Sequence, residues 1–201
     1  MARWHQSEFS LKLLQEKGFF QRLGEILHFS FGELLLKREE ITFDDENLTK
    51  AVGRALFLYP EPLPEREALK EEALKILKSI SLSRDWRVLQ NLLKKSKALY
   101  REVEGYLAGE DKVLRPDFIL VQEREIYLLE FKLRKEDLQE EQLKLYQRFL
   151  ELLFPQWEIR LCLLTFIPFQ LKFFKKPEEG LSHEASKLLH TTQLSLFEEF
   201  N

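Results

Sequence analysis

Apolar residues recur at helical spacing through the first half of the chain, from residue 7 to about residue 100. The pattern is carried by LKLLQEKGFF, LGEILHFSFGELLL, NLTKAVGRALFL, EREALKEEALKILKSI and WRVLQNLLKKSKALY. Residues three and four positions apart share one face of a helix, so each segment would bury one apolar face. YPEPLPE separates the third segment from the fourth, because its prolines cannot lie inside a helix. The pattern therefore predicts a helical N-terminal half.

After residue 100 the spacing changes to that of β-strands. The strand-like segments are REVEGYLAG, VLRPDFILV, EIYLLEFKL and EIRLCLLTF, and short polar turns such as GEDK and QERE join the first three. Between the third and fourth lies KEDLQEEQLKLYQRFLELL, an amphipathic helix. A crossover helix usually joins parallel strands, so the order β-β-β-α-β predicts an α/β fold with a mixed sheet covered by helices.

Three charged residues interrupt the apolar strands. Asp117 precedes FILV, and Glu130 and Lys132 lie near the end of the next strand. Because a tight turn joins the two strands, both carboxylates can project toward one point. Lys132 shares a strand face with Glu130, since the two are two residues apart. Ionised residues are costly to bury, and the sequence therefore predicts a functional cluster here.

Two converging carboxylates repel each other unless a cation lies between them. Mg²⁺ and Mn²⁺ prefer oxygen ligands and keep positions open for water or phosphate oxygens. A nearby lysine can orient an attacking water and offset charge on a pentavalent phosphate. These residue types in this arrangement indicate phosphodiester hydrolysis, whereas a solvated turn beside a surface ion pair is the alternative.

Composition narrows the class of protein. The chain has 201 residues, is 44% hydrophobic and 32% charged, and carries a net charge of -3. A chain of this length predicts one domain with attachments. Because it has no apolar leader segment and no apolar segment long enough to span a bilayer, we expect a cytoplasmic location and no membrane contact. The single cysteine, Cys162, cannot hold an iron–sulfur cluster. The negative net charge limits any DNA contact to a local patch.

RPD followed by EFK, within the predicted β-β-β-α-β order, resembles the PD-(D/E)xK nuclease superfamily. Two further motifs resemble its RecB-like branch. Gly24 and His28 form G-x-x-x-H on an apolar helix, and Gln142 and Tyr146 form Q-x-x-x-Y on the crossover helix. The alternatives are a core histidine and an ordinary amphipathic helix with Tyr146 in the core.

The resemblance implies a site and an activity. His28, Asp117, Glu130 and the carbonyl of Phe131 would hold one Mg²⁺ or Mn²⁺, and Lys132 would be catalytic together with both carboxylates. Gln142, Tyr146 and an acid on the first strand would support the site. Glu102 is the expected acid, although Glu104 lies on the same face. The implied activity is cleavage of single-stranded DNA or DNA ends, by exonuclease rather than endonuclease action.

The resemblance also sets the domain organisation. A RecB-like nuclease domain would cover residues 1–176, with a helical part over 1–100 and a sheet core over 101–176. Many relatives are fused to a helicase, but this chain has no Walker A motif, so a separate helicase is a possible partner.

The C-terminal segment carries an independent motif. QLSLF, formed by Gln193, Leu194, Ser195, Leu196 and Phe197, resembles the pentapeptide by which bacterial proteins bind their DNA sliding clamp. We expect residues 177–201 to be a flexible tail that docks its apolar side chains in the clamp. The alternative is a terminal helix packed on the body.

Two other classes of function remain open at this stage. The protein could be a catalytically idle DNA-binding subunit of a helicase–nuclease assembly, or an adaptor whose main task is clamp binding. An intact set of Asp117, Glu130 and Lys132 argues against the first. The sequence leaves polarity, DNA versus RNA preference and oligomeric state undetermined.

Overall fold

Helices form the first part of the chain, as the apolar pattern predicts. The computed structural model describes residues 8–38, 41–60, 62–107 and 112–174. Its first helices are α1 (Glu8–Leu35), α2 (Asp45–Leu58), α3 (Arg66–Ile80) and α4 (Arg84–Lys95). Side-chain caps fix two of their starts: Asp44 accepts a hydrogen bond from the Asn47 N–H of α2 (2.8 Å), and Ser83 accepts one from the Asp85 N–H of α4 (3.1 Å).

A mixed five-stranded sheet forms the second part. Its order is β1 (Ala98–Arg101), β4 (Phe118–Val121), β5 (Glu125–Lys132), β6 (Glu158–Phe166) and β7 (Phe169–Phe173). β5 and β6 are parallel and the other neighbours are antiparallel. A short 3₁₀ helix η2 (Lys135–Asp137) and helix α5 (Glu140–Leu153) connect the parallel pair. β2 (Gly105–Leu107) and β3 (Lys112–Leu114) pair separately. The α/β class and the mixed sheet are therefore confirmed.

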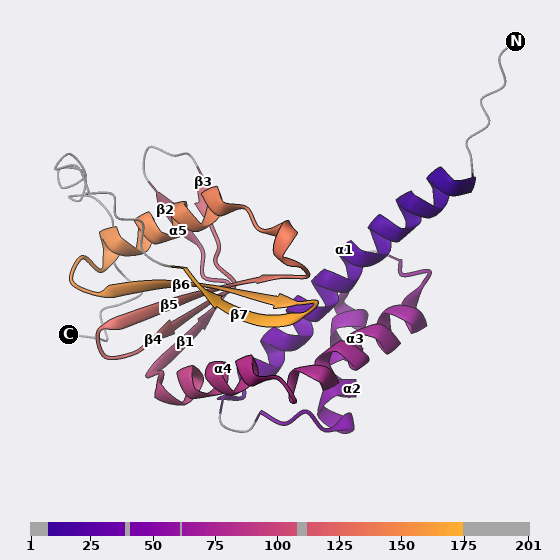
Figure 1. Cartoon of the computed structure of the whole chain (residues 1–201), viewed down its shortest axis with the longest axis horizontal. Coiled ribbons are helices and arrows are strands. Elements are labelled where there is room, and N and C mark those ends of the chain that lie inside the picture. The colour runs from indigo at the N-terminus through magenta and orange to yellow at the C-terminus, as the bar shows by residue number, and fades with distance from the viewer. Residues whose placement is uncertain (1–7, 39–40, 61, 108–111, 175–201) are drawn as a thin grey trace, which may run out of the picture.

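The sheet lies between two helical layers, with α4 and the other N-terminal helices on one face and α5 on the other (Figure 1). Alternate residues of each strand enter different cores, as the period of a strand requires. Phe118 and Leu129 belong to the core under the N-terminal helices, whereas Ile119 and Leu128 belong to the core under α5. Each core thus has its own set of strand side chains.

Five elements differ from the sequence prediction. The predicted first strand, REVEGYLAG, is not one strand, because β1 ends at Arg101 and β2 begins at Gly105 in a separate pair; Glu102 and Glu104, expected on the first strand, lie between the two. The first two helical segments form one continuous helix, α1. The segment ALYR, predicted as the end of a helix, is the edge strand β1, because α4 ends at Lys95. The predicted strand VLRPDFILV is divided into β3 and β4 around Pro116, whose ring has no N–H to donate to a ladder. The edge strand β7 was not predicted, because it is half exposed and lacks a buried apolar pattern.

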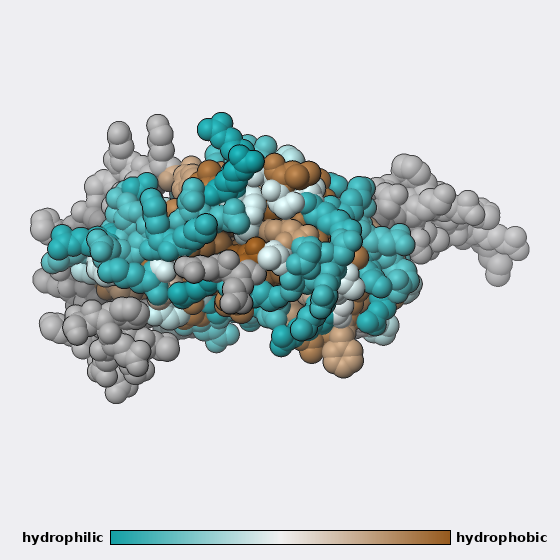
Figure 2. All heavy atoms as spheres, turned by 90° about the horizontal axis from the view of Figure 1, so that it is seen from below, coloured by the Kyte–Doolittle hydropathy of each residue, from teal (hydrophilic) through white to brown (hydrophobic). Residues whose placement is uncertain are grey.

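Polar residues cover most of the face seen from the side of α4, and apolar residues show only in small areas between them (Figure 2). Within the described ranges, no helix is both long enough and apolar enough to cross a bilayer.

Candidate functional site

Asp117 and Glu130 are neighbours across the β4–β5 ladder. Phe118 pairs with Leu129, so the residues just beyond this pair, Asp117 and Glu130, lie opposite each other. The Phe131 N–H also donates a hydrogen bond to Asp117 Oδ2 (2.5 Å). The predicted convergence of the two carboxylates from adjacent strands is thus present in the structure.

Lys132 is bound to Glu130. Its Nζ lies 2.7 Å from Glu130 Oε1, as expected for two residues that share a strand face. The Lys132 side chain is 21% exposed and the Glu130 side chain 3% exposed, so the ammonium reaches solvent while the carboxylate does not.

The Glu130 carboxylate is incompletely compensated. Its second oxygen, Oε2, is buried and has no hydrogen-bond partner among the described residues. Burial, together with the charge of Asp117, raises the pKa of Glu130 to about 7, although Lys132 opposes both effects. A buried acceptor without a donor is unfavourable, so this oxygen is suited to receiving a cation or a proton.

His28 comes to the same place from helix α1. Its Nε2 lies 2.8 Å from Asp117 Oδ1, and its ring centroid is 5.4 Å from that of Phe131. The space for a side chain is tighter at Gly32, one turn after His28, than at Gly24. A Cβ at Gly32 would lie 3.1 Å from Arg101 Cζ, whereas a Cβ at Gly24 would meet Leu133 Cβ at an ordinary 3.6 Å. The packing of α1 therefore does not require glycine at position 24.

Glu102 is the acid next to the site on the β1 side. Its N–H donates to the Asp117 carbonyl (3.0 Å), and its backbone has a φ of 51°, unusual for a residue with a side chain. Burial would raise the pKa of Glu102, but the hydrogen bond from Arg115 and the charge of Arg101 outweigh it and lower that pKa. Glu104 is 68% exposed against 28% for Glu102, so the structure distinguishes the two candidates.

Gln142 and Tyr146 face each other on α5. The Gln142 Nε2 group donates to the Tyr146 hydroxyl (2.6 Å), which in turn donates to the Arg115 carbonyl (3.1 Å). Burial raises the pKa of Tyr146 to about 12, and the nearby charge of Glu130 contributes. Tyr146 is thus both a core residue and a support for the segment that leads into Asp117.

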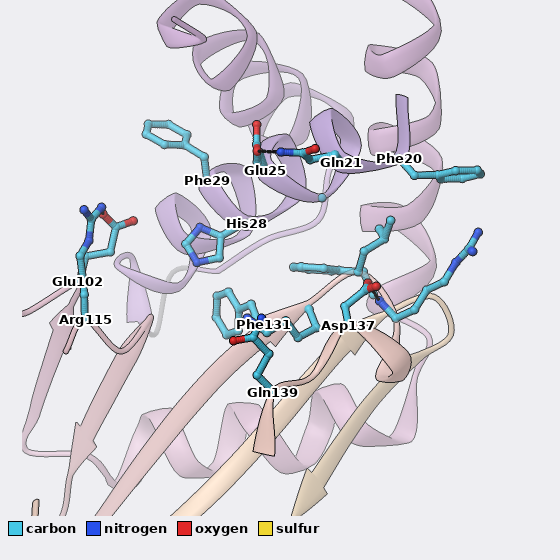
Figure 3. Close-up of a pocket in the computed structure, with 15 residues that line it drawn as sticks. Phe20, Gln21, Glu25, His28, Phe29, Glu102, Arg115, Phe131, Asp137 and Gln139 are labelled. Atoms are coloured by element: carbon cyan, nitrogen blue, oxygen red, sulfur yellow. Dashed lines mark hydrogen bonds and ion pairs between the residues drawn. The ribbon is translucent and has the colours of Figure 1, made fainter. Parts of the chain in front are cut away.

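An open cavity of about 1060 Å³ lies beside these residues (Figure 3). His28 lies between Phe20 on one side of the close-up and Glu102 with Arg115 on the other. The residues lining the cavity come from α1, the positions just after β1 and just before β4, the end of β5 and the segment from there to α5, and the end of β6. They are Phe20, Gln21, Gly24, Glu25, His28, Phe29, Glu102, Arg115, Phe131, Lys132, Leu133, Arg134, Asp137, Gln139 and Phe166.

The fit to a divalent cation can be judged from the donors present. Asp117, Glu130, His28 and the Phe131 carbonyl are oxygen and imidazole donors of the type that Mg²⁺ or Mn²⁺ accepts. Among the described residues, no three acidic, histidine or cysteine side chains are already gathered around one point. Asp117 contacts His28, and Glu130 forms an ion pair with Lys132. Glu130 Oε2 has no hydrogen-bond partner among the described residues, so it is the oxygen that a bound cation would contact.

Several cavity residues were missed in the sequence. Gln21 and Glu25 lie seven and three residues before His28, on the same helix face, so helical spacing counted back from His28 could have identified them. No pattern in the sequence links Phe20 to Arg134, because their contact depends on how α1 packs against the end of β5. The predicted clamp motif, Gln193 to Phe197, lies outside the described residues.

Comparison with protein-family models gives no match for this sequence, and comparison with curated proteins gives none either.

Proposed function

We propose that this chain is a divalent-metal-dependent DNA nuclease of the PD-(D/E)xK, RecB-like type. It would act on single strands or DNA ends during repair or replication, as an exonuclease rather than an endonuclease. The observation that carries the proposal is the buried Glu130 carboxylate, which lies beside Asp117, is bound on one oxygen by Lys132 and lacks a partner on the other.

The order of elements supports the fold part of the proposal. β1, β4 and β5 precede α5, which crosses to the parallel strand β6. This is the β-β-β-α-β order expected of the nuclease core, and the motif residues lie at one end of its central strands. His28 arrives from a helix more than eighty residues earlier in the chain, which a chance motif match would not require.

Each residue has a distinct role in hydrolysis. Asp117, Glu130, His28 and the Phe131 carbonyl would hold the cation, which supplies charge stabilisation for the phosphate and a lowered pKa for attacking water. Asp117 keeps its orientation through the Phe131 N–H. Lys132 lines the cavity, so its ammonium can offset charge on the reacting phosphodiester or orient the water. Water attacks phosphorus and gives up a proton to solvent, the bond to the leaving oxygen breaks, and that oxygen takes a proton from solvent.

Two partners belong to the proposal. The QLSLF motif supports recruitment by the bacterial DNA sliding clamp, and a separate helicase could supply unwound DNA. The alternative is a catalytically idle DNA-binding or clamp-adaptor subunit of a helicase–nuclease assembly.

Cleavage of end-labelled DNA tests the proposal. Single-stranded and duplex substrates are incubated with the full chain in Mg²⁺, Mn²⁺ or chelator. We expect metal-dependent cleavage by the unmodified protein and by Glu123→Gln, an exposed control, and none by Asp117→Asn. DNA binding without cleavage in either metal would contradict the proposal and favour the idle subunit.

A further inference from the structure

One wall of the cavity is aromatic and half open to solvent. Phe20 projects from α1 and is 37% exposed. Its neighbour Phe19 meets it edge to face, with ring centroids 5.8 Å apart, and packs against the main core. The exposed ring of Phe20, held by its partly buried neighbour, presents a flat apolar surface to a ligand.

Arg134 covers part of this ring. Its Cζ lies 4.6 Å from the Phe20 ring centroid, so the guanidinium and the ring form a cation–π pair. The Arg134 N–H bonds to Asp137 Oδ2 (2.9 Å), which fixes the backbone at the end of β5. Guanidinium planes stack on flat rings and donate hydrogen bonds to phosphates from their edges.

The other cations of the cavity are already paired. Arg115 is bound to Glu102 (2.6 Å) and Lys132 to Glu130 (2.7 Å). In the described part of the chain, no carboxylate lies within ion-pair distance of the Arg134 guanidinium. Among the lining cations that the structure describes, Arg134 is therefore the one whose charge is available to a ligand.

A second cation–π pair nearby shows the contrast. Arg101 lies 4.9 Å from the Phe29 ring centroid, but it also pairs with Glu33 (2.7 Å) and is only 14% exposed. Phe29 also lines the cavity, but the charge of Arg101 is compensated by Glu33, whereas both Phe20 and Arg134 line the cavity and Arg134 has no such partner among the described residues. A built aromatic surface with an unpaired cation beside it is suited to a planar ring that carries a neighbouring anion.

We infer that Phe20 and Arg134 form a stacking subsite for one nucleobase of an unpaired DNA strand, near the phosphodiester bond that is cleaved. This inference rests on the proposed function and names the residues that select its substrate. Phe20 and His28 lie about two turns apart on α1, and both line the cavity, with Phe20 on the opposite side of His28 from Arg115 (Figure 3). A strand bound at His28 can therefore extend along the cavity to Phe20. Bases within a duplex stack on each other and have no free face, so only an unpaired or frayed base can occupy the subsite.

Two oligonucleotides separate base stacking from phosphate contact. Binding of a short single-stranded oligothymidylate and of an abasic strand of equal length is measured by fluorescence anisotropy in chelator. Phe20→Leu should weaken binding of the oligothymidylate about ten-fold and leave the abasic strand unchanged. Phe20→Trp should bind both as the unmodified protein does. Phe57→Leu, which alters an exposed phenylalanine of α2 outside the cavity, is the control and should change neither.

Arg134→Gln tests the cation separately and should weaken binding of both strands. Equal affinity losses for the two strands in Phe20→Leu, or no loss in either, would overturn the subsite, as would an Arg134→Gln protein that binds both strands normally. Cleavage assays in Mn²⁺ keep the two ideas apart. If the unmodified protein cleaves no DNA, the proposed function fails, but the anisotropy assay still measures base binding at the subsite. If the protein cleaves DNA and Phe20→Leu weakens binding of both strands equally or of neither, only the subsite is ruled out.

Discussion

His28 Nε2 lies 2.8 Å from Asp117 Oδ1, and this contact joins helix α1 to the start of strand β4. The same carboxylate accepts the Phe131 N–H of β5 on its other oxygen. Asp117 is therefore the residue through which the helical part and the sheet part meet at the candidate site.

Replacing Asp117 should abolish cleavage and retain the fold. Asp117→Asn keeps an oxygen that can accept the Phe131 N–H and removes the charge that raises the pKa of Glu130. Metal-dependent cleavage should fall below detection, because one of the two carboxylates that hold the cation is lost. The circular dichroism spectrum should be unchanged. Asp117→Ala should likewise lose cleavage, but it should melt at a lower temperature than Asp117→Asn, because it also loses the acceptor for the Phe131 N–H. Normal activity in either variant would remove Asp117 from the site.

Lys132 and Arg134 should have separable roles. Lys132→Ala should lower the cleavage rate by orders of magnitude, because its ammonium lies beside Glu130. Arg134 lies beyond the end of β5 and should affect mainly the apparent affinity for DNA. Steady-state kinetics on a single-stranded substrate measures both effects. Equal, small changes in the two variants would mean that Lys132 is not catalytic.

The metal-free protein should lose stability as pH rises through the range in which Glu130 titrates. The pKa of Glu130 is about 7 in the folded protein, against 4.5 for an unperturbed glutamate. Between these values the folded state binds more protons than the unfolded state, so the free energy of unfolding falls as pH increases. Glu130→Gln should remove this fall. Denaturant melts in chelator at about pH 5 and about pH 8 measure it, with Glu123→Gln as the exposed control. The same slope in both variants would exclude Glu130.

Two glycines of α1 should respond differently to alanine. Gly24→Ala should raise the melting temperature, since alanine favours a helix by about 1 kcal/mol over glycine and its Cβ fits against Leu133. Gly32→Ala should melt below Gly24→Ala, because its Cβ would crowd Arg101 and the fully buried Phe118. Thermal melts of both proteins decide the order, and a higher melting temperature for Gly32→Ala would contradict the packing described.

Clamp binding should depend on Leu196 and Phe197, which lie outside the described residues. Replacing both with alanine removes two apolar anchors, each worth about 1.5 to 3 kcal/mol when buried. A pull-down with purified bacterial sliding clamp should lose the protein, while cleavage of short oligonucleotides should be unaffected. A lowered melting temperature, with no clamp binding by the unmodified protein, would instead indicate a tail packed on the body.

The sequence was most informative where local periodicity determines geometry. Alternation along a strand placed Lys132 with Glu130, and a tight turn placed Asp117 beside them, because these relations depend only on neighbouring residues. It was least informative at edges and long-range approaches. β1 and β7 are edge strands with partly exposed side chains, and the contact of Phe20 with Arg134 joins segments that only the folded chain brings together.

The separation of His28 from Asp117 along the chain has a consequence during synthesis. The helix that carries His28 is made long before β5, whose last residue is Lys132. An incomplete chain that ends before β5 contains neither Glu130 nor Lys132 and so lacks two residues of the candidate site. A complete set of site residues therefore exists only in chains whose sheet has been translated at least through its central strand, which ties the onset of any activity to completion of the fold.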